Sequence, residues 1–234
     1  MAHAVRTSLI LPTYNERETL PPLLAALYPV ASGLGLEVVV VDDASPDGTA
    51  EVAARMAAEG PLGIRMVRRP RKEGLASAVL AGASIAAGGI IVVMDADGSH
   101  PPGLIAPLVA AVAGGADVAV ASRYVAGGRI ERWPARRRLA SRVATVIARR
   151  LLRLGALDPL SGFFAARREV FTRRAYWGIG FKILLELLAR NPDLAVAEVP
   201  YTFTDRSGGQ SKLNRGEVAA YLRLIGRLLR ERGS

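Results

Sequence analysis

The chain has 234 residues, half of them hydrophobic, so it can bury a full core as one domain. It has no cysteine, which excludes disulfides, thiolate metal sites and cysteine nucleophiles, and its two histidines are too few for a His-rich zinc site. A net charge of +10 predicts an anionic partner: nucleic acid, a phosphorylated substrate or acidic lipid headgroups.

Membrane-spanning and secretory segments are not expected. No uninterrupted apolar run approaches the roughly 20 residues that a bilayer requires. The N-terminus leads directly into a predicted strand and has no apolar signal-peptide core. We therefore expect an intracellular protein without a transmembrane helix.

Strands and helices alternate along the first half of the chain. Apolar runs predict short strands at residues 7–11 (ended by Pro12), 37–41, 64–67, 90–94 and 118–121. Helices are expected around residues 20–27, at residues 50–58 and 74–87, and after Pro101-Pro102. This order predicts an α/β fold, with a Rossmann-like, mostly parallel central sheet flanked by helices.

Two carboxylates follow the central predicted strand. Asp95 and Asp97 come directly after the apolar run 90–94, and Gly98 lets the chain turn. Ligands of open α/β sheets bind beyond the carboxyl ends of the strands, and two such carboxylates suit a divalent cation that substrate phosphates also hold. The structural alternative is a strand-to-helix turn with an aspartate N-cap.

Residues 132–153 form a strongly basic stretch, with eight arginines and no acidic residue. Apolar side chains at three- and four-residue spacing predict an amphipathic helix here: Leu139, Val143, Ile147, Leu151 and Leu154. Either this face packs on the sheet, with solvated arginines opposite, or the helix lies at a membrane surface whose anionic lipids attract the arginines. The stretch by itself favours neither interpretation.

The remaining chain predicts five further segments: a turn into a strand at residues 161–164, a helix at 181–190, an extended segment at 196–203, a polar loop at 205–212 and a helix at 217–230. The last helix is expected to present one apolar face, formed by Val218, Tyr221, Leu222, Ile225 and Leu229.

Several motifs resemble those of the family-2 inverting glycosyltransferases. They are Pro12-Thr13-Tyr14-Asn15-Glu16, Val41-Asp42-Asp43 followed by Ser45-Pro46-Asp47-Gly48-Thr49, and Asp95-Ala96-Asp97 followed by Ser99-His100-Pro101-Pro102. Others are similar to the dolichol (polyprenol) phosphate mannose synthases of that family: Ser122-Arg123-Tyr124, Ser161-Gly162-Phe163, Lys182, Glu198-Val199-Pro200, and Arg206 with Gly209, Ser211 and Lys212. The match runs from about residue 8 to 214, and several motifs in order are a stronger signal than one.

This resemblance implies a GT-A fold and the inverting transfer of mannose from GDP-mannose to a polyprenyl (dolichyl-type) monophosphate, with a divalent cation, Mg²⁺ or Mn²⁺. We expect a single domain of residues 1–234, with a donor-binding half at about 1–125 and an acceptor- and membrane-facing half at about 126–234. The chain departs from the family at Gly98, where a leucine is usual, and at Ala76, where glycine is commoner. It also shows no C-terminal transmembrane pair. We therefore expect peripheral attachment to the cytoplasmic face of a membrane, through amphipathic helices or an anchoring partner protein.

Roles in the site follow from this resemblance and from side-chain chemistry. Asp95, Asp97 and Ser99 would hold the metal ion. The cations expected to hold the two phosphorylated substrates in line are Arg123, Arg137, Lys182, Arg206 and Lys212. The other residues expected to bind the donor or its phosphates are Pro12, Tyr14, Glu16, Asp42, Asp43, Lys72, Gly74, Ala96, Ser161 and Ser211. An ionised lipid phosphate needs little help from a general base, so the expected catalytic residues are Asp97, Arg123, Arg206 and Lys212.

Three of these assignments have structural alternatives. Asp42 and Asp43 are also suited to helix capping. Glu16 is also suited to the first turn of a helix, where its charge complements the dipole. Lys182 is one helical turn from Glu186, which makes a salt bridge the alternative to phosphate binding.

Other positions in the same regions are less specific. Arg137 cannot be distinguished from its neighbours Arg136 and Arg138 by sequence. His100 is expected to be a loop residue rather than a ligand. The Gly-rich loop 205–212 is expected to close over the donor and exclude water.

Three competing functions remain open at the level of sequence. UDP-glucose as donor requires the same chemistry. Nucleic-acid binding fits the net charge, but it does not explain acidic residues at several predicted strand ends, so we expect no nucleic-acid partner. A catalytically silent membrane scaffold is the third possibility, and the intact Asp95, Asp97 and Arg123 argue against it.

Overall fold

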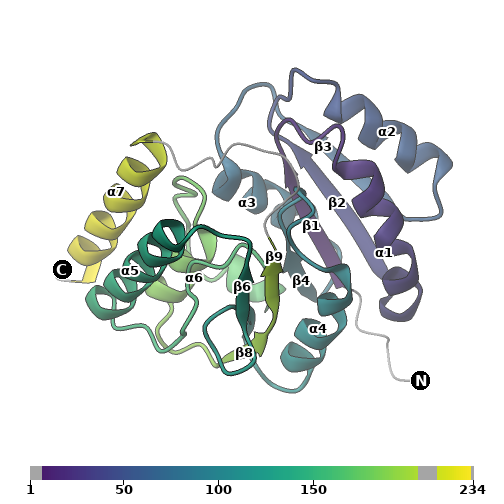
Figure 1. Cartoon of the computed structure of the whole chain (residues 1–234). Helices are drawn as coiled ribbons and strands as arrows, with labels where there is room; N and C mark the ends of the chain where they lie inside the picture. The colour runs from purple at the N-terminus through teal and green to yellow at the C-terminus, as the bar shows by residue number, and fades with distance from the viewer. Residues whose placement is uncertain (1–6, 205–214, 233–234) are drawn as a thin grey trace.

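The computed structural model describes residues 7–204 and 215–232, and its centre is one seven-stranded sheet (Figure 1). The strands are β1 Thr7–Thr13, β2 Leu36–Asp42, β3 Ile64–Arg68, β4 Ile90–Val93, β5 Val118–Ser122, β7 Phe164–Arg167 and β8 Val196–Pro200. Their order is β3-β2-β1-β4-β7-β5-β8, and only β7 runs antiparallel to its neighbours. β6 Arg129–Glu131 and β9 Thr202–Thr204 form a separate two-stranded ribbon.

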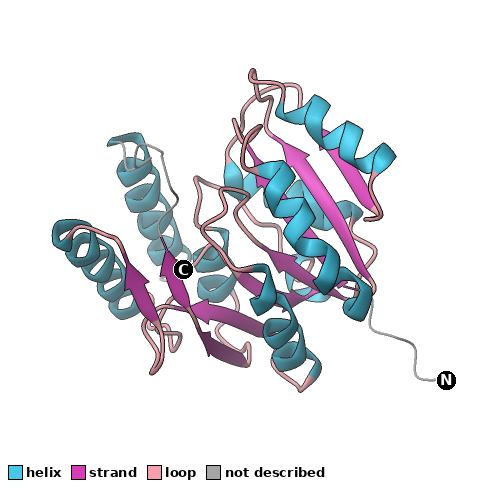
Figure 2. Cartoon of the chain, turned by 45° about the vertical axis from the view of Figure 1, so that its right-hand side comes forward, coloured by secondary structure: helices cyan, strands magenta, loops and turns pink. Residues whose placement is uncertain are grey.

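Helices cover both faces of the sheet (Figure 2). They are α1 Leu20–Leu34, α2 Thr49–Glu59, α3 Leu75–Ile85, α4 Ile105–Ala113, α5 Ala135–Leu151, α6 Ile183–Arg190 and α7 Arg215–Arg232, with 3-10 turns η1 Pro102–Leu104 and η2 Arg168–Phe171. None of the helices within the described ranges is long and apolar enough to cross a bilayer.

The central strands β1, β4 and β5 read as continuous apolar runs because both of their faces are buried. Leu9 and Leu11 of β1 join the core cluster that contains α1 and α4 residues, whereas Ile10 between them joins the cluster under α3 and α6. Successive side chains of a strand point to opposite faces, so each run supplies both cores. The predicted α/β fold with a mostly parallel sheet is confirmed.

Two predicted boundaries are wrong. β1 does not end before Pro12 but continues to Thr13, because at Pro12 it pairs only with β2, opposite Val41. A proline is tolerated where one side of the strand has no partner. The helix predicted at residues 181–190 begins at Ile183, so Lys182 precedes it at the N-cap position.

α5 and α7 pack on each other and against α6 at one end of the molecule (Figure 1). Ala148 and Leu152 of α5 and its C-terminus pack with Leu224, Ile225 and Leu228 of α7. The Tyr221 hydroxyl of α7 also donates to the carbonyl of Ala144 at 2.7 Å. Thus α5 and α7 are neighbours and share a small apolar core.

The apolar stripe predicted for α5 does not pack on the sheet. Four of its predicted members are exposed: Leu139 by 65%, Val143, Ile147 and Leu151. The fifth, Leu154, lies beyond the helix and packs inward. Val146, which the predicted stripe did not include, is exposed as well. The apolar face predicted for α7 is only partly buried. Ile225 is buried and Tyr221 packs inward, but Val218, Leu222 and Leu229 are exposed. The interpretation of α5 as a surface helix whose apolar face packs on the sheet is therefore wrong.

Candidate active site at the carboxyl edge of the sheet

The antiparallel strand β7 brings a distant turn beside the central carboxylates. Val93 at the end of β4 pairs with Phe164 at the start of β7, so the turn that precedes β7 reaches the edge where β4 ends. There Gly162 lies against Asp95: a Cβ on Gly162 would be only 2.5 Å from Asp95 Oδ2. A side chain at position 162 would therefore displace the Asp95 carboxylate, and the glycine leaves room for it.

The Asp95-Ala96-Asp97 turn presents two half-buried carboxylates. Asp97 Oδ1 accepts hydrogen bonds from the Ser99 amide at 3.1 Å and the Ser99 hydroxyl at 2.6 Å. Gly98 adopts a φ of 76°, a left-handed conformation that suits the glycine found here in place of leucine. Ala96 is buried in the core between the two aspartates.

This donor set fits a divalent cation that shares its ligands with a substrate. Within residues 7–204 and 215–232, no cluster of three or more His, Cys, Asp or Glu side chains forms a complete cage. Two carboxylates and a serine hydroxyl at one edge are instead the arrangement expected when phosphate oxygens complete the coordination of Mg²⁺ or Mn²⁺. The expected metal ligands are thus brought together.

His100 is a buried loop residue and lies beside the carboxylate of Asp95. Its Nε2 is 3.4 Å from Asp95 Oδ2, and its Nδ1 is 3.4 Å from the Tyr201 hydroxyl. The imidazole packs among the rings of Phe163, Tyr201 and Phe203. The sequence predicted the loop but not this packing, since Tyr201 and Phe203 are a hundred residues away.

The paired aspartates after β2 organise loops. Asp42 is buried and accepts hydrogen bonds from the Ser45 amide at 3.0 Å and hydroxyl at 2.5 Å. Asp43 accepts from the Gly74 amide at 2.8 Å and pairs with Arg69 at 2.9 Å. The helix-capping alternative is wrong for both, because α2 follows Gly48 and receives no side-chain cap from them.

Tyr14 and Lys72, both expected at the donor site, are in contact. The Lys72 ammonium lies 3.4 Å from the centroid of the Tyr14 ring, a cation–π geometry. Glu16 is buried and its Oε2 accepts the Thr19 hydroxyl at 2.7 Å. It precedes α1 by four residues, so it does not belong to the first helical turn. Pro12 is buried in β1.

Arg123 forms a bidentate ion pair with Asp158, a residue for which the sequence predicted no role. Arg123 Nε and Nη2 each donate to the carboxylate at 2.7 Å, and the Arg123 amide donates to it at 3.0 Å. Burial acts to lower the pKa of Arg123, but the hydrogen bonds and charge of Asp158 more than offset this and raise it. The only sequence signal for Asp158 is its position three residues before the Ser161-Gly162-Phe163 motif.

Lys182 lies close to Arg123 and Asp95, and donates to the carbonyl of Leu160 at 2.7 Å. Burial, together with the charge of Arg123, lowers the pKa of Lys182 to about 8. The predicted alternative, a salt bridge to Glu186, is wrong. Glu186 instead accepts hydrogen bonds from the amides of Trp177 and Gly178.

Arg137 differs from its arginine neighbours. It is half-buried, with its guanidinium 4.1 Å from the Trp133 ring centroid, whereas Arg136 and Arg138 are exposed. Trp133 in turn packs edge-on against Phe203 of the β6–β9 ribbon. The structure therefore distinguishes Arg137 from Arg136 and Arg138, which the sequence could not do.

Four further expected residues complete the account. Ser161 is buried and its hydroxyl donates to the carbonyl of Ala121 at 2.8 Å, so it fixes the turn before β7. Arg206, Ser211 and Lys212, like the loop 205–212 that was expected to close, lie outside the described residues.

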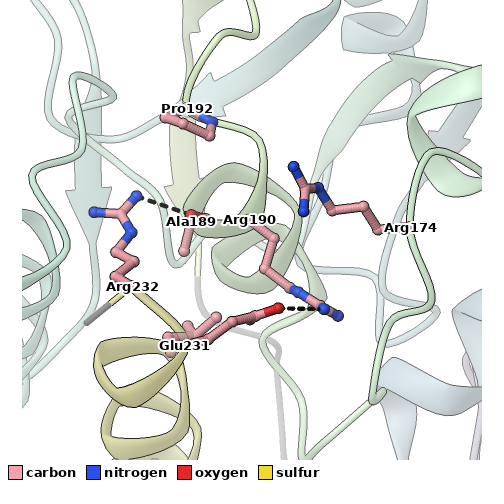
Figure 3. Close-up of a pocket in the computed structure, with 7 residues that line it drawn as sticks. Arg174, Ala189, Arg190, Pro192, Glu231 and Arg232 are labelled. Carbon is pink, nitrogen blue, oxygen red and sulfur yellow. Dashed lines mark hydrogen bonds and ion pairs between the residues drawn. The ribbon is translucent and has the colours of Figure 1, made fainter. Parts of the chain in front are cut away.

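A cavity of about 140 Å³ lies at the far end of α6 from Lys182, against α7 (Figure 3). It is lined by Arg174, Ala189, Arg190, Pro192, Leu228, Glu231 and Arg232. Arg190 donates to Glu231 at 2.6 Å and Arg232 donates to the carbonyl of Ala189 at 2.8 Å, so both guanidinium groups hold α7 against α6. None of the expected site residues lines it.

Known proteins share this chain's sequence and fold. The dolichol-phosphate mannosyltransferase of Pyrococcus furiosus is 44% identical over 98% of the chain and 65% of its own length, so the chain spans less than two thirds of it. The polyprenol monophosphomannose synthase of Mycolicibacterium smegmatis is 39% identical over 97% of the chain and 91% of its own length. The crystal structure of glucosyl-3-phosphoglycerate synthase from Mycobacterium tuberculosis with Mn²⁺, uridine diphosphate and glucosyl-3-phosphoglycerate has a TM-score of 0.71 at 26% identity, over 97% of this chain and 79% of that one.

These similarities confirm the predicted resemblance and the GT-A architecture. The family model of glycosyl transferase family 2 matches residues 8–174, which are more than half of the sequence and include Asp95 and Asp97. This chain belongs to glycosyl transferase family 2.

Proposed function

We propose that the chain transfers mannose from GDP-mannose to a polyprenyl monophosphate, with inversion and with the assistance of Mg²⁺ or Mn²⁺. The observation that carries the proposal lies at the carboxyl edge of the sheet, where Asp95 approaches the turn before β7 and Lys182 is buried within the electrostatic influence of both Asp95 and Arg123. A divalent cation and cationic side chains together offset the repulsion between a nucleoside diphosphate and a second phosphate. The names of the relatives support mannose and polyprenyl phosphate as the transferred group and the acceptor.

The carboxylates and the cations have separate tasks. A divalent cation held by Asp95 and Asp97, with Ser99 beside them, would neutralise the charge that builds on the departing nucleoside diphosphate. Arg123 and Lys182 would hold the acceptor phosphate in line with the anomeric carbon. An oxygen of that phosphate forms the new bond from the side opposite the leaving group, which inverts the configuration. No proton has to be removed, so the chemistry requires no general base.

Tyr14 and Lys72 are proposed to line the donor nucleoside and its phosphates. They project from the end of β1 and from the loop that Asp43 fixes through Gly74. Lys72 is exposed, and its ammonium over the Tyr14 ring leaves donors free to turn toward a phosphate.

The exposed apolar and basic faces of α5 and α7 are proposed to lie on a membrane surface. Leu139 and Leu222 are each more than half exposed, and the arginines around them, such as Arg142 and Arg223, are exposed as well. Helices of this composition insert their apolar face between lipids while arginines contact anionic headgroups. Such contact would bring the site to its lipid acceptor at the cytoplasmic face.

The decisive experiment measures sugar transfer by the purified protein to polyprenyl phosphate. GDP-mannose and UDP-glucose are compared as donors, each with Mg²⁺, with Mn²⁺ and with chelator. We expect metal-dependent transfer from GDP-mannose alone. Transfer only from UDP-glucose would replace the donor and keep the mechanism, and transfer from neither would contradict the proposal.

A further inference from the structure

Asp158 is a fully buried carboxylate. It belongs neither to the Asp95-Ala96-Asp97 turn nor to the loops that Asp42 and Asp43 fix. Its carboxylate accepts three hydrogen bonds from Arg123: from the amide at 3.0 Å, from Nε at 2.7 Å and from Nη2 at 2.7 Å. The side chain of Arg123 is itself only 8% exposed. Two groups that carry opposite charges are therefore desolvated together.

Asp158 is held in turn by a second carboxylate. Glu198 of β8 accepts the amides of Leu157 at 2.7 Å and of Asp158 at 3.0 Å. β8 pairs in parallel with β5, with Glu198 opposite Val120, and Arg123 directly follows the end of β5. A continuous set of bonds thus runs from the sheet through Glu198 and Asp158 to the guanidinium.

This support restricts an otherwise flexible side chain. An arginine side chain has many rotamers, but its guanidinium offers five donors in a rigid planar fork. With Nε and one Nη2 hydrogen committed to Asp158, the remaining donors keep a fixed direction. Asp158 offsets much of the charge of Arg123. The pair therefore contributes to substrate binding mainly by directing the free guanidinium donors, and less by its net charge.

We propose that Asp158, supported by Glu198, is a positioning residue that fixes the Arg123 guanidinium for the acceptor phosphate. The inference rests on the proposed function for the identity of that phosphate. Asp158 itself does not touch the substrate, and it acts only through Arg123.

A double-mutant cycle tests this dependence on Arg123. Asp158→Asn, Arg123→Ala and the double variant are compared by kcat/KM for the acceptor and by thermal unfolding. Both single variants should lose about 100-fold in kcat/KM, and the double variant should be no worse than Arg123→Ala. Glu198→Gln should lose less, since its amide oxygen still accepts one of the two amides. Independent, multiplying losses would mean that Asp158 only stabilises the fold, and would overturn the proposal.

Asp117→Asn is the matched control. Asp117, at the other end of β5, accepts the Ala195 amide at 2.9 Å and pairs with Arg167 at 3.5 Å, so it also connects a loop to the sheet, but at the opposite edge. It should lower the unfolding temperature and leave kcat/KM unchanged.

Two further measurements test the positioning role of Asp158: chemical rescue of activity, and NMR, which does not depend on the proposed function. Guanidinium ion at millimolar concentration should restore part of the activity of Arg123→Ala and none to the double variant, which lacks the carboxylate that binds it. In the NMR spectrum, the Arg123 Nε–H should exchange slowly in the wild type and in Asp117→Asn, and at least tenfold faster in Asp158→Asn. Unchanged exchange would overturn the positioning role, even if the wild type transferred no sugar. Absence of transfer, with the exchange effect intact, would count against the proposed function alone.

Discussion

Gly162 and Asp95 are in contact although 67 positions separate them in the sequence: a Cβ on Gly162 would lie 2.5 Å from Asp95 Oδ2 and 3.1 Å from Cγ. The contact exists because β7 runs antiparallel beside β4 and begins where β4 ends. It makes the position of Asp95, a proposed metal ligand, dependent on a distant glycine.

Gly162→Ala should therefore disturb the metal site without unfolding the protein. The added methyl group must displace the Asp95 carboxylate, and a displacement of about 1 Å in such a site can cost about 100-fold in rate. The measurement is kcat/KM as a function of Mn²⁺ concentration. Gly103→Ala is the control, since a Cβ there meets nothing within 4 Å. Equal activity of the two variants would show that Asp95 tolerates the shift.

Asp97→Ala should abolish the metal dependence of transfer. The proposed Lewis acid lowers the activation barrier by several kcal/mol. A loss of about 100-fold or more in the rate of transfer is therefore expected in saturating Mg²⁺ or Mn²⁺. Binding of Mn²⁺ with the nucleoside diphosphate, followed by electron paramagnetic resonance, should weaken in parallel. Asp193→Ala removes an exposed aspartate that pairs only at the surface, with Arg173 at 3.0 Å, and should change neither quantity.

The activity should fall as the pH rises through about 8. Lys182 must be charged to hold a phosphate, and burial lowers its pKa to about 8 in the free protein. The profile of kcat/KM for the acceptor should show this loss. In Lys182→Arg the loss should move to higher pH, because a guanidinium stays charged. If kcat/KM for the acceptor did not change up to pH 9, the proposed role of Lys182 in binding the acceptor phosphate would be wrong.

The same lysine predicts a change in stability with the opposite sign. Its pKa is about 8 in the folded chain against 10.5 when unfolded, so between these values the unfolded chain binds the extra proton. The free energy of unfolding contributed by Lys182 should therefore rise with pH across this window. Thermal unfolding of the wild type minus that of Lys182→Met isolates the contribution, and a difference independent of pH would contradict it.

The exposed faces of α5 and α7 predict binding to acidic vesicles. Leu139→Glu and Leu222→Glu should each weaken co-sedimentation by about tenfold or more, since burial of one leucine is worth roughly 1.5–3 kcal/mol. Transfer to a short, water-soluble acceptor should be unchanged. Val196→Glu, a matched change at an exposed residue of β8, should bind vesicles normally. Equal binding by all three variants would rule out this surface.

Local patterns predicted most of the fold and much of the candidate site. Apolar runs marked the parallel strands, and the carboxylates after them marked the edge of the sheet, because a strand's end and the turn that follows are set by a few neighbouring residues. Asp95, Asp97 and Arg123 could be proposed for that reason, whereas Lys182 was proposed from the family resemblance. Their partners could not: Asp158 follows no pattern that spacing reveals, and Glu198 belonged to a recognised motif but had no predicted partner. Tyr201 approaches His100 only through the pairing of β8 with β5.

The sequence by itself determined the alternation of strands and helices and the chemistry at the strand ends. The tertiary structure decided which distant segments meet and which apolar stripes are buried. The reversed direction of β7 placed Gly162 against Asp95. In α5 the small residues Thr145 and Ala148 face the protein, while the larger stripe around Leu139 faces solvent. Periodicity shows that a helix has an apolar face, but only the shape of the neighbouring layers determines what that face contacts.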